Sequence, residues 1–219
     1  MCGRYTLFTK AEALAERFQV ALPQDLFTPT YNAAPSQGQL TILNATPHEM
    51  TRSAWGFVPE WAAGRQGVKA VINARAESVA DKPFFREAFK TKRCLVLADG
   101  FYEWKRSGTR KVSYRIALKT EEPFAFAGLW SLVHDQDGQE QTTFAIITTD
   151  ANELVAQIHD RMPVMLREQD EAAWLDPTVP LHAAQALLAP FPAERLTAYE
   201  VSPKVNSPAF NTPEAIQRV

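Results

Sequence analysis

A succession of strand-length apolar runs between residues 94 and 149 constrains the fold of this chain most strongly. The runs are CLVLADG (94–100), FYEWK (101–105), KVSYRIALK (111–119), FAFAGLWSLV (124–133) and TTFAIITT (142–149). Short turns such as SGTR (107–110) and DQDGQ (135–139) separate several of them. Strands joined by short turns pair antiparallel, whereas parallel strands need a long crossover between them. The region therefore predicts a mainly antiparallel sheet and excludes alternating βαβ units.

Helical patterns are inserted irregularly around these strands. Thr9 and Glu12 have the spacing of a capping box, which predicts a helix over about 9–19. Asp81 is placed to cap a short helix that contains Phe85 and Phe89. The other expected helices cover 151–158, 167–175 and 181–189, and the other expected strands cover 39–43, 161–166 and 197–202.

No linker interrupts this pattern, so we predict one domain over residues 1–219. Its expected class is α+β, with a mainly antiparallel sheet curled into a barrel-like core and helices at the periphery. No apolar run is long enough to span a bilayer, and no apolar signal region follows the start of the chain. We therefore expect a cytoplasmic protein without a membrane partner.

Composition narrows the function classes. A net charge of −2 and a pI of about 6.1 argue against broad, charge-driven coating of nucleic acid, although they allow a local basic groove. Two cysteines form neither a disulfide framework nor a CxxC pair, which points to a reducing compartment. Neither a GxGxxG fingerprint nor a HxxxH spacing is present. We expect no metal and no nucleotide cofactor.

One of the two cysteines, Cys2, follows the initiator Met1 directly. Initiator methionine is commonly removed before a small residue, and removal here would leave a free amine and a thiol on one residue. The plain alternative is a small residue near a frayed terminus. The second cysteine, Cys94, lies in an apolar run and is expected to be a buried core thiol.

Three further polar residues stand beside apolar strands: Asn73, Glu103 and His159. A carboxyl among aromatic residues, as at Glu103, resists ionisation and suits proton transfer near neutral pH. Each residue also has a structural explanation. Asn73 could bond the backbone at a strand end, and Glu103 could form an ion pair with Lys105. His159 could stand at a helix C-terminus, where the helix dipole favours it. Together with Cys2, they indicate thiol chemistry without metal. That chemistry is either amide hydrolysis by a Cys/His pair or amine chemistry at a free N-terminal cysteine.

Six motifs occur in one order along nearly the whole chain: MCGRY (1–5), YNAAP (31–35), WGFVPEW (55–61), INARAES (72–78), ADGFYEW (98–104) and HDRMP (159–163). In these motifs the chain resembles the SOS response-associated peptidase (SRAP) family, whose members process abasic sites in single-stranded DNA. The resemblance implies a barrel-like α+β domain with a positively charged DNA channel. It also implies single-stranded DNA containing abasic sites as the partner, and we expect a monomer.

The resemblance implies that Cys2, freed of Met1, captures the opened abasic sugar as a thiazolidine. Asn73, Glu103 and His159 would fill the other catalytic positions. The DNA-binding positions would be Arg4, Asn32, Trp61, Arg75, Thr148 and Arg161. Removal of Met1 would be carried out by the same groups or by an aminopeptidase. Two other functions remain open: a thiol peptidase with Cys2 as nucleophile and His159 as base, and a non-catalytic reader of single-stranded DNA.

Overall fold

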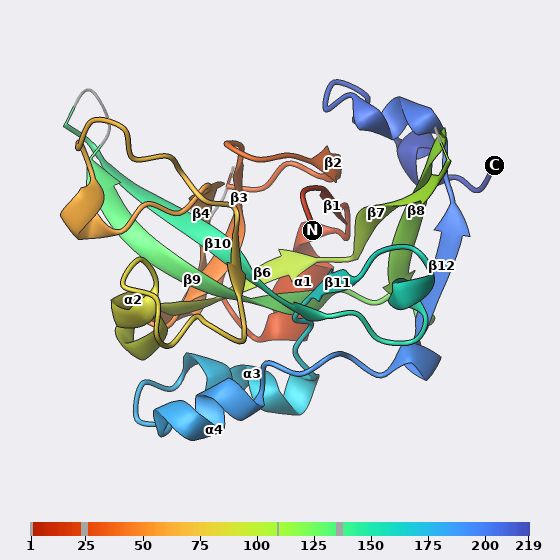
Figure 1. Cartoon of the computed structure of the whole chain (residues 1–219). Helices are drawn as coiled ribbons and strands as arrows, with labels where there is room; N and C mark the ends of the chain where they lie inside the picture. Colours follow the sequence, from red (N-terminus) through yellow and green to blue (C-terminus); the bar gives the residue numbers. More distant parts are fainter. Residues whose placement is uncertain (1, 23–25, 109, 135–137) are drawn as a thin grey trace.

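The computed structural model describes residues 2–22, 26–108, 110–134 and 138–219 (Figure 1). At its centre five strands pair around a closed ring, with β10 joining β9 on one side and β4 on the other. In ring order these strands are β4 (Thr46–Trp55), β3 (Gly38–Leu43), β6 (Arg93–Ala98), β9 (Phe124–His134) and β10 (Glu140–Asp150). Two short strands, β5 (Asn73–Arg75) and β11 (Arg161–Pro163), pair with β10 beyond its contacts with β4.

The barrel core depends on β6 and β9, which are largely apolar on both faces, whereas β4 exposes Pro47, His48, Glu49 and Arg52. All of β6 is buried, as is most of β9, which matches the near-continuous apolar runs of the sequence. Gly128 pairs with Cys94 where these two strands meet. A Cβ at Gly128 would lie 2.8 Å from the Cys94 sulfur and 2.8 Å from Val96, so the close approach of the strands requires glycine.

A second sheet packs beside the barrel in the order β12–β8–β7–β1–β2. Its strands are β1 (Tyr5–Leu7), β2 (Thr30–Ala33), β7 (Gly100–Ser107), β8 (Arg110–Leu118) and β12 (Leu196–Glu200). Only Asp99 separates β6 of the barrel from β7 of this sheet. The first strand of the chain, β1, is held between β7 and β2. The N-terminus therefore lies where the two sheets meet (Figure 1).

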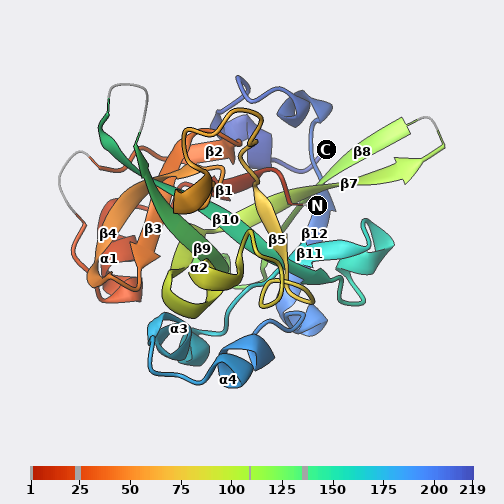
Figure 2. The same cartoon turned by 60° about the vertical axis from the view of Figure 1, so that its left-hand side comes forward.

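The helices lie at the periphery, and Figure 2 shows α3 and α4 together on one side of the barrel. Buried Arg93 at the start of β6 holds this layer in place. Its guanidinium donates to the carbonyls of Phe89, at the end of α2, and of Trp174 and Asp176, at the end of α3. A cation is favourable at helix C-termini. The helices are α1 (Ala11–Phe18), α2 (Arg86–Thr91), α3 (Glu168–Leu175) and α4 (Leu181–Ala186).

Five short 3₁₀ segments complete the described elements: η1 (Glu60–Ala62), η2 (Val155–Gln157), η3 (Ala193–Arg195), η4 (Pro203–Asn206) and η5 (Pro213–Ile216). The last two belong to a C-terminal segment that covers one face of the second sheet. There Tyr102 packs with Val201, Val205 and Ala215 in a small apolar cluster separate from the main core.

The expected fold class is confirmed: α+β, mainly antiparallel, with a barrel core and peripheral helices. Three local predictions are wrong. Asp81 does not cap the short helix, because α2 begins only at Arg86, after Phe85, and has no side-chain cap. The capping box does not form, because Thr9 donates its N–H and hydroxyl to Asp99 and α1 begins only at Ala11. The helix expected over 151–158 is reduced to η2.

Part of the expected turn at 135–139 lies outside the described residues. Among the residues that the structure does describe, no helix combines the length and the apolarity needed to cross a bilayer.

Candidate active site

The start of the chain is fixed by its pairing with β7. Tyr5 lies opposite Phe101, and the N–H of Tyr102 donates to the Arg4 carbonyl at 3.0 Å. Continuing the antiparallel register brings the backbone before Tyr5 alongside Glu103. The pairing thus carries Cys2 to the buried end of the β1–β7 ladder.

Cys2 is fully buried, and its Sγ lies 3.9 Å from the Arg4 carbonyl oxygen. Burial raises the pKa of the Cys2 thiol well above its ordinary value, and the negative charge of Glu103 raises it further. The thiol is therefore held as S–H. It is not poised as the thiolate that a cysteine next to a cation would form.

Asn73 joins this site from β5. The parallel pairing of β5 with β10 sets Asn73 level with Ile146. Its amide nitrogen donates to the Cys2 carbonyl at 2.9 Å, across 71 residues of sequence. Its amide oxygen is buried and accepts no hydrogen bond from the residues that the structure describes. An unfilled buried acceptor costs about 1–3 kcal/mol, so this oxygen is ready for a donor such as an amine or a hydroxyl.

Glu103 is buried on β7, and burial raises its pKa above the ordinary carboxyl range while the charge of His159 opposes the increase. The negative charge of Glu103 in turn raises the pKa of the Cys2 thiol, in addition to the larger effect of burial. Glu103 is thus coupled to Cys2 on one side and to His159 on the other. A carboxyl with a raised pKa can both donate and accept a proton near neutral pH.

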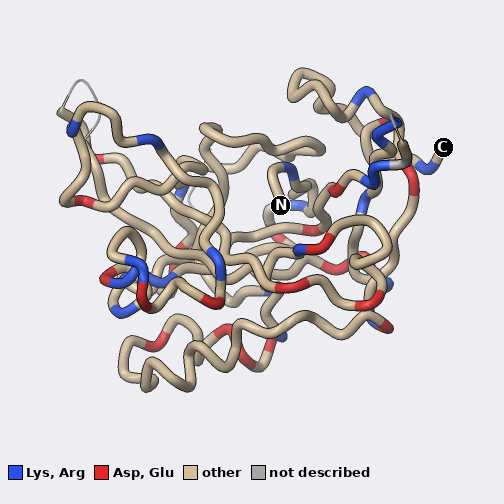
Figure 3. Tube along the Cα trace, viewed as in Figure 1, with Lys and Arg blue, Asp and Glu red and all other residues tan. Residues whose placement is uncertain are grey.

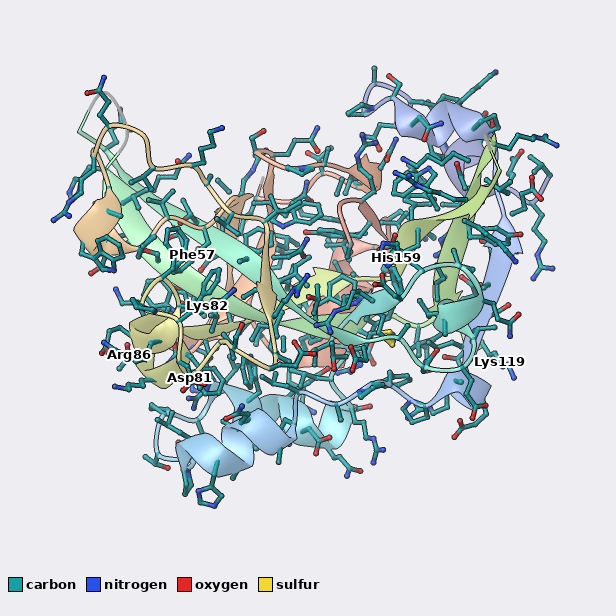
Figure 4. All side chains as sticks on the ribbon, in the orientation of Figure 1. Phe57, Asp81, Lys82, Arg86, Lys119 and His159 are labelled. Atoms are coloured by element: carbon teal, nitrogen blue, oxygen red, sulfur yellow. The ribbon has the colours of Figure 1, made fainter. Side chains whose placement is uncertain are left out.

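His159 lies on the turn between η2 and β11, on the side of the molecule where β7 runs (Figure 4). Its Nδ1 accepts the Arg161 N–H at 3.0 Å, which leaves the ring hydrogen of the neutral form on Nε2. The Asp160 carboxylate lies 2.9 Å from the same Nδ1, a contact suited to the protonated ring. These two contacts fix the orientation of the imidazole ring.

Arg161 is engaged inside the protein. Its guanidinium contacts the carboxylates of Glu77 and Asp150, each at a closest distance of 2.6 Å, and donates to the Thr148 carbonyl at 2.8 Å. Thr148 itself is fully buried, and its hydroxyl donates to the Ala74 carbonyl. Both residues fix β11 and β5 against β10, and thereby the backbone that carries His159 and Asn73.

Arg4 and Asn32 form a second internal pair. Arg4 donates to the Asn32 side-chain oxygen at 3.0 Å and to the carbonyls of Val205 and Asn206. The Asn32 amide nitrogen lies within 3.1 Å of three carbonyl oxygens of the C-terminal segment, those of Val205, Ser207 and Phe210. These two residues attach the C-terminal segment to the wall of the site.

Arg75 and Trp61 are exposed instead. The Arg75 side chain makes no hydrogen bond or ion pair within the described part of the chain, although its charge helps to lower the pKa of the nearby Glu77 carboxyl, which the hydrogen bond from Arg161 lowers most. Trp61 on η1 is 51% exposed and carries Arg65 at 5.5 Å from its ring centre. Of the six residues expected to bind DNA, these two present free surface.

Charge is unevenly distributed around this site. The 61–72 loop and the 104–111 part of the β7–β8 hairpin contain basic residues and no acidic ones. The N-terminus lies between these two segments (Figures 1 and 2). In Figure 3 the upper half of the molecule carries mostly Lys and Arg, whereas acidic residues dominate the half that contains α3 and α4. The net negative charge therefore conceals a basic side.

Asp99, which sequence reasoning missed, holds the site together. It accepts hydrogen bonds from Thr6, Phe8 and Thr9 and lies 3.8 Å from the Arg115 guanidinium. A carboxylate directly after the apolar run CLVLA was an available signal. In the described parts of the chain, no group of three or more His, Cys, Asp or Glu side chains could hold a metal ion.

Comparisons with known proteins identify the family. The model of the family described as "SOS response associated peptidase (SRAP)" matches residues 1–208. The abasic site processing protein YoqW of Bacillus subtilis (strain 168) is 44% identical over 223 residues, covering 99% of each chain. The abasic site processing protein HMCES of Xenopus tropicalis is 31% identical, over 89% of this chain and 68% of its own length.

A solved structure from Bacteroides thetaiotaomicron shares the fold, with a TM-score of 0.89, 30% identity and complete coverage of both chains. The match of the family model to nearly the whole length, together with these relatives, shows that the chain belongs to the SOS response associated peptidase (SRAP) family.

Proposed function

We propose that this protein captures abasic sites in single-stranded DNA as a covalent adduct on Cys2. The observation that carries the proposal is the 2.9 Å hydrogen bond from Asn73 to the Cys2 carbonyl, which holds the start of the chain in a buried position beside Glu103. Relatives named as abasic site processing proteins supply the substrate class.

The reaction requires that Met1 has been removed, a residue that lies outside the described part of the chain. The free α-amine of Cys2 adds to the aldehyde carbon of the opened sugar and gives a carbinolamine. Loss of one water gives an imine. The thiol sulfur then bonds to the same carbon, while its proton passes by way of Glu103 to the nitrogen, and a five-membered thiazolidine results. The amine and thiol belong to one residue, so the second step is intramolecular and benefits from a high effective concentration.

The raised pKa of the Cys2 thiol fits this order of events. An α-amine with an ordinary pKa near 8 is partly neutral at physiological pH, whereas a buried S–H does not react first. Glu103 then accepts the thiol proton and assists the departure of water, as its own raised pKa permits. His159 donates a proton to the ring oxygen as the sugar opens. The unfilled oxygen of Asn73 accepts a hydrogen from the amine or from the sugar hydroxyl.

Single-stranded DNA fits the exposed groups around the site. Trp61 offers a ring on which a base can stack, and Arg75 offers a guanidinium for a phosphate. The basic side makes binding dependent on salt despite the acidic pI. The other four predicted DNA-binding residues chiefly form the wall that positions the reacting groups, and we propose that they also line the path of the DNA: Arg4, Asn32, Thr148 and Arg161.

A thiol peptidase is the less favoured function. Such an enzyme needs a thiolate or a closely paired imidazole, whereas burial and Glu103 both raise the pKa of the Cys2 thiol. We further propose that the whole chain acts as one domain, as a monomer, and in the cytoplasm in association with the DNA it protects.

A denaturing gel tests the proposal. Purified protein is mixed with a single-stranded oligonucleotide carrying one abasic site and is heated in detergent. We expect a band at the summed mass for the wild type and none for Cys2→Ala. Cys94→Ala, which removes the other buried thiol, should still give the band and serves as the matched control. Peptide turnover without DNA would favour the peptidase. Salt-dependent binding with no heat-stable band would favour a non-catalytic reader.

A further inference from the structure

The β7–β8 hairpin carries a concentration of positive charge whose individual residues have no role in the covalent chemistry proposed above. Lys105, Arg106, Arg110 and Lys111 are all exposed, and residues 104–120 include no acidic side chain. Arg106 lies directly opposite Lys111 in the ladder. Like charges directly opposite each other destabilise an antiparallel pair, and a bound polyanion would relieve that repulsion.

The two faces of this hairpin have different surroundings. Side chains alternate between the faces along a strand, so Tyr102, Trp104 and Arg106 share one face. That face packs against the C-terminal segment, and Lys111 lies 4.6 Å from the centre of the Trp104 ring. The ammonium group of Lys111 on this face is therefore already in a cation–π contact with Trp104.

The opposite face leads outward from the active site. Glu103 and Lys105 share it on β7, and the register Lys105↔Val112 and Ser107↔Arg110 places Arg110 on the same face of β8. At about 3.4 Å per residue, Lys105 lies roughly 7 Å along the strand from Glu103, and the pair that contains Arg110 lies roughly 14 Å away. Two cations thus continue the line that begins at the buried carboxyl.

We propose that Lys105 and Arg110 bind successive phosphates of the DNA strand as it leaves the Cys2 site on one side of the lesion. Arg106 and Lys111, on the other face, take no part. The inference rests on the proposed function, because it assumes that a polynucleotide enters at Cys2. It implies that the preferred substrate carries several nucleotides on one particular side of the abasic site.

The test uses oligonucleotides that contain tetrahydrofuran, an abasic analogue without an aldehyde, so that binding is measured without reaction. One oligomer has three nucleotides with the analogue in the middle. Two longer oligomers, of about fifteen nucleotides, carry it second from the 5′ end or second from the 3′ end. The double variant Lys105→Gln/Arg110→Gln is compared with Arg106→Gln/Lys111→Gln, which removes the same charge from the other face.

We expect Lys105→Gln/Arg110→Gln to weaken binding of one long oligomer about tenfold at low salt and to reduce its salt slope by about 1.4, the value for two phosphate contacts on a single strand. Binding of the other long oligomer and of the three-nucleotide oligomer should not change. The charge-conserving variant Lys105→Arg/Arg110→Lys should restore most of the affinity. Equal losses in both double variants, a loss on all oligomers, or no loss would each overturn the inference.

Failure of this inference can be told apart from failure of the proposed function. Both double variants should form the covalent adduct at wild-type rates with a three-nucleotide oligomer that carries a true abasic site. Absence of adduct in the wild type would refute the proposed function, whereas the binding comparison between hairpin faces would still be measurable.

Discussion

Asp99 and Glu103 are buried carboxyl groups four residues apart, and they have opposite surroundings. Asp99 lies between β6 and β7, and Glu103 lies within β7. Asp99 accepts hydrogen bonds from two backbone N–H groups and two hydroxyls and lies near Arg115. Burial raises the pKa of Glu103, and this effect outweighs the opposing charge of His159. A carboxylate supplied with donors holds the structure together, whereas one that resists ionisation can exchange protons.

This contrast explains how the start of the chain is held in a buried position. Asp99 fixes the turn that follows β1 by binding Phe8 and Thr9, and the β1–β7 ladder then carries the preceding residues inward. The Asp99 region thus orders the start of the chain and places Cys2 beside Glu103 and Asn73.

The largest expected effect on the free energy of unfolding is at Asp99. Asp99→Ala should lower the free energy of unfolding by about 3–5 kcal/mol, because it removes the acceptor of the Phe8 and Thr9 N–H groups and of two hydroxyls, together with the carboxylate 3.8 Å from buried Arg115. Urea unfolding measures the loss. Asp81→Ala, an exposed carboxylate, is the control and should change stability by less than about 0.5 kcal/mol. A loss at Asp99 of under about 1 kcal/mol would contradict its structural role.

Glu103→Gln should have the opposite pattern of effects: a large loss of reaction rate and no loss of stability. The rate of adduct formation with abasic DNA should fall about a hundredfold or more, because the proton carrier is lost. The free energy of unfolding at pH 7 should stay constant or increase, because the neutral amide avoids the burial of a charge. Exposed Glu122→Gln is the control. A stability loss above about 2 kcal/mol with an unchanged rate would make Glu103 structural.

The pH dependence of stability sharpens the same comparison. The pKa of Glu103 is higher in the folded state than in the unfolded chain, so the folded state binds more protons above about pH 4.3. Stability therefore declines as pH rises from that value through the folded-state pKa. Melting temperatures of the wild type should fall relative to Glu103→Gln over this window. Parallel curves for the two proteins would argue against the raised pKa.

Gly100→Ala tests the packing of the Asp99 region. An added Cβ would lie 2.8 Å from Arg115 Nε, and Arg115 is buried and cannot move aside. We expect a loss of about 1–3 kcal/mol. Gly38→Ala is a matched control, since its Cβ would meet Arg52 Nε at 2.5 Å, but Arg52 is exposed and can rotate away. Equal losses at the two glycines would show that burial of the arginine is not the cause.

Asn73→Ala should produce the smallest effect on both measures. Adduct formation should slow about tenfold, because the Cys2 carbonyl loses its donor. Stability should change by less than about 1 kcal/mol, since removal of the unfilled amide oxygen offsets the lost hydrogen bond. Single-turnover rates and urea unfolding measure the two. A large stability loss with an unaffected rate would make Asn73 a purely structural residue.

Much of the fold could be predicted because its strands are continuous apolar runs, as in β6 and β9. Closure of the barrel could not, because the parallel pairing of β10 with β4 joins segments about ninety residues apart. The expected helix at 151–158 fails because Asn152 makes tertiary contacts. Its side chain accepts from the Val155 N–H and donates to the Phe191 carbonyl, which favours a turn.

The sequence could single out residues that the structure brings together near Cys2, but it could not predict their surroundings. Unusual positions of Cys2 and Glu103 could be read directly, and Asn73 indeed contacts Cys2. The sequence could not show that Asn32 would be occupied by carbonyls more than 170 residues away, or that Arg161 would be occupied by two carboxylates. Their role in DNA binding stays a prediction.

The intact mass of the adduct tests the central claim most directly. Wild-type protein is reacted with an abasic oligonucleotide without reductant, and the product is weighed. The account predicts a chain that begins at Cys2, joined to the oligonucleotide with loss of one water and with no remaining free thiol at that residue. A stable adduct on protein that retains Met1, or on Cys2→Ala, would contradict it.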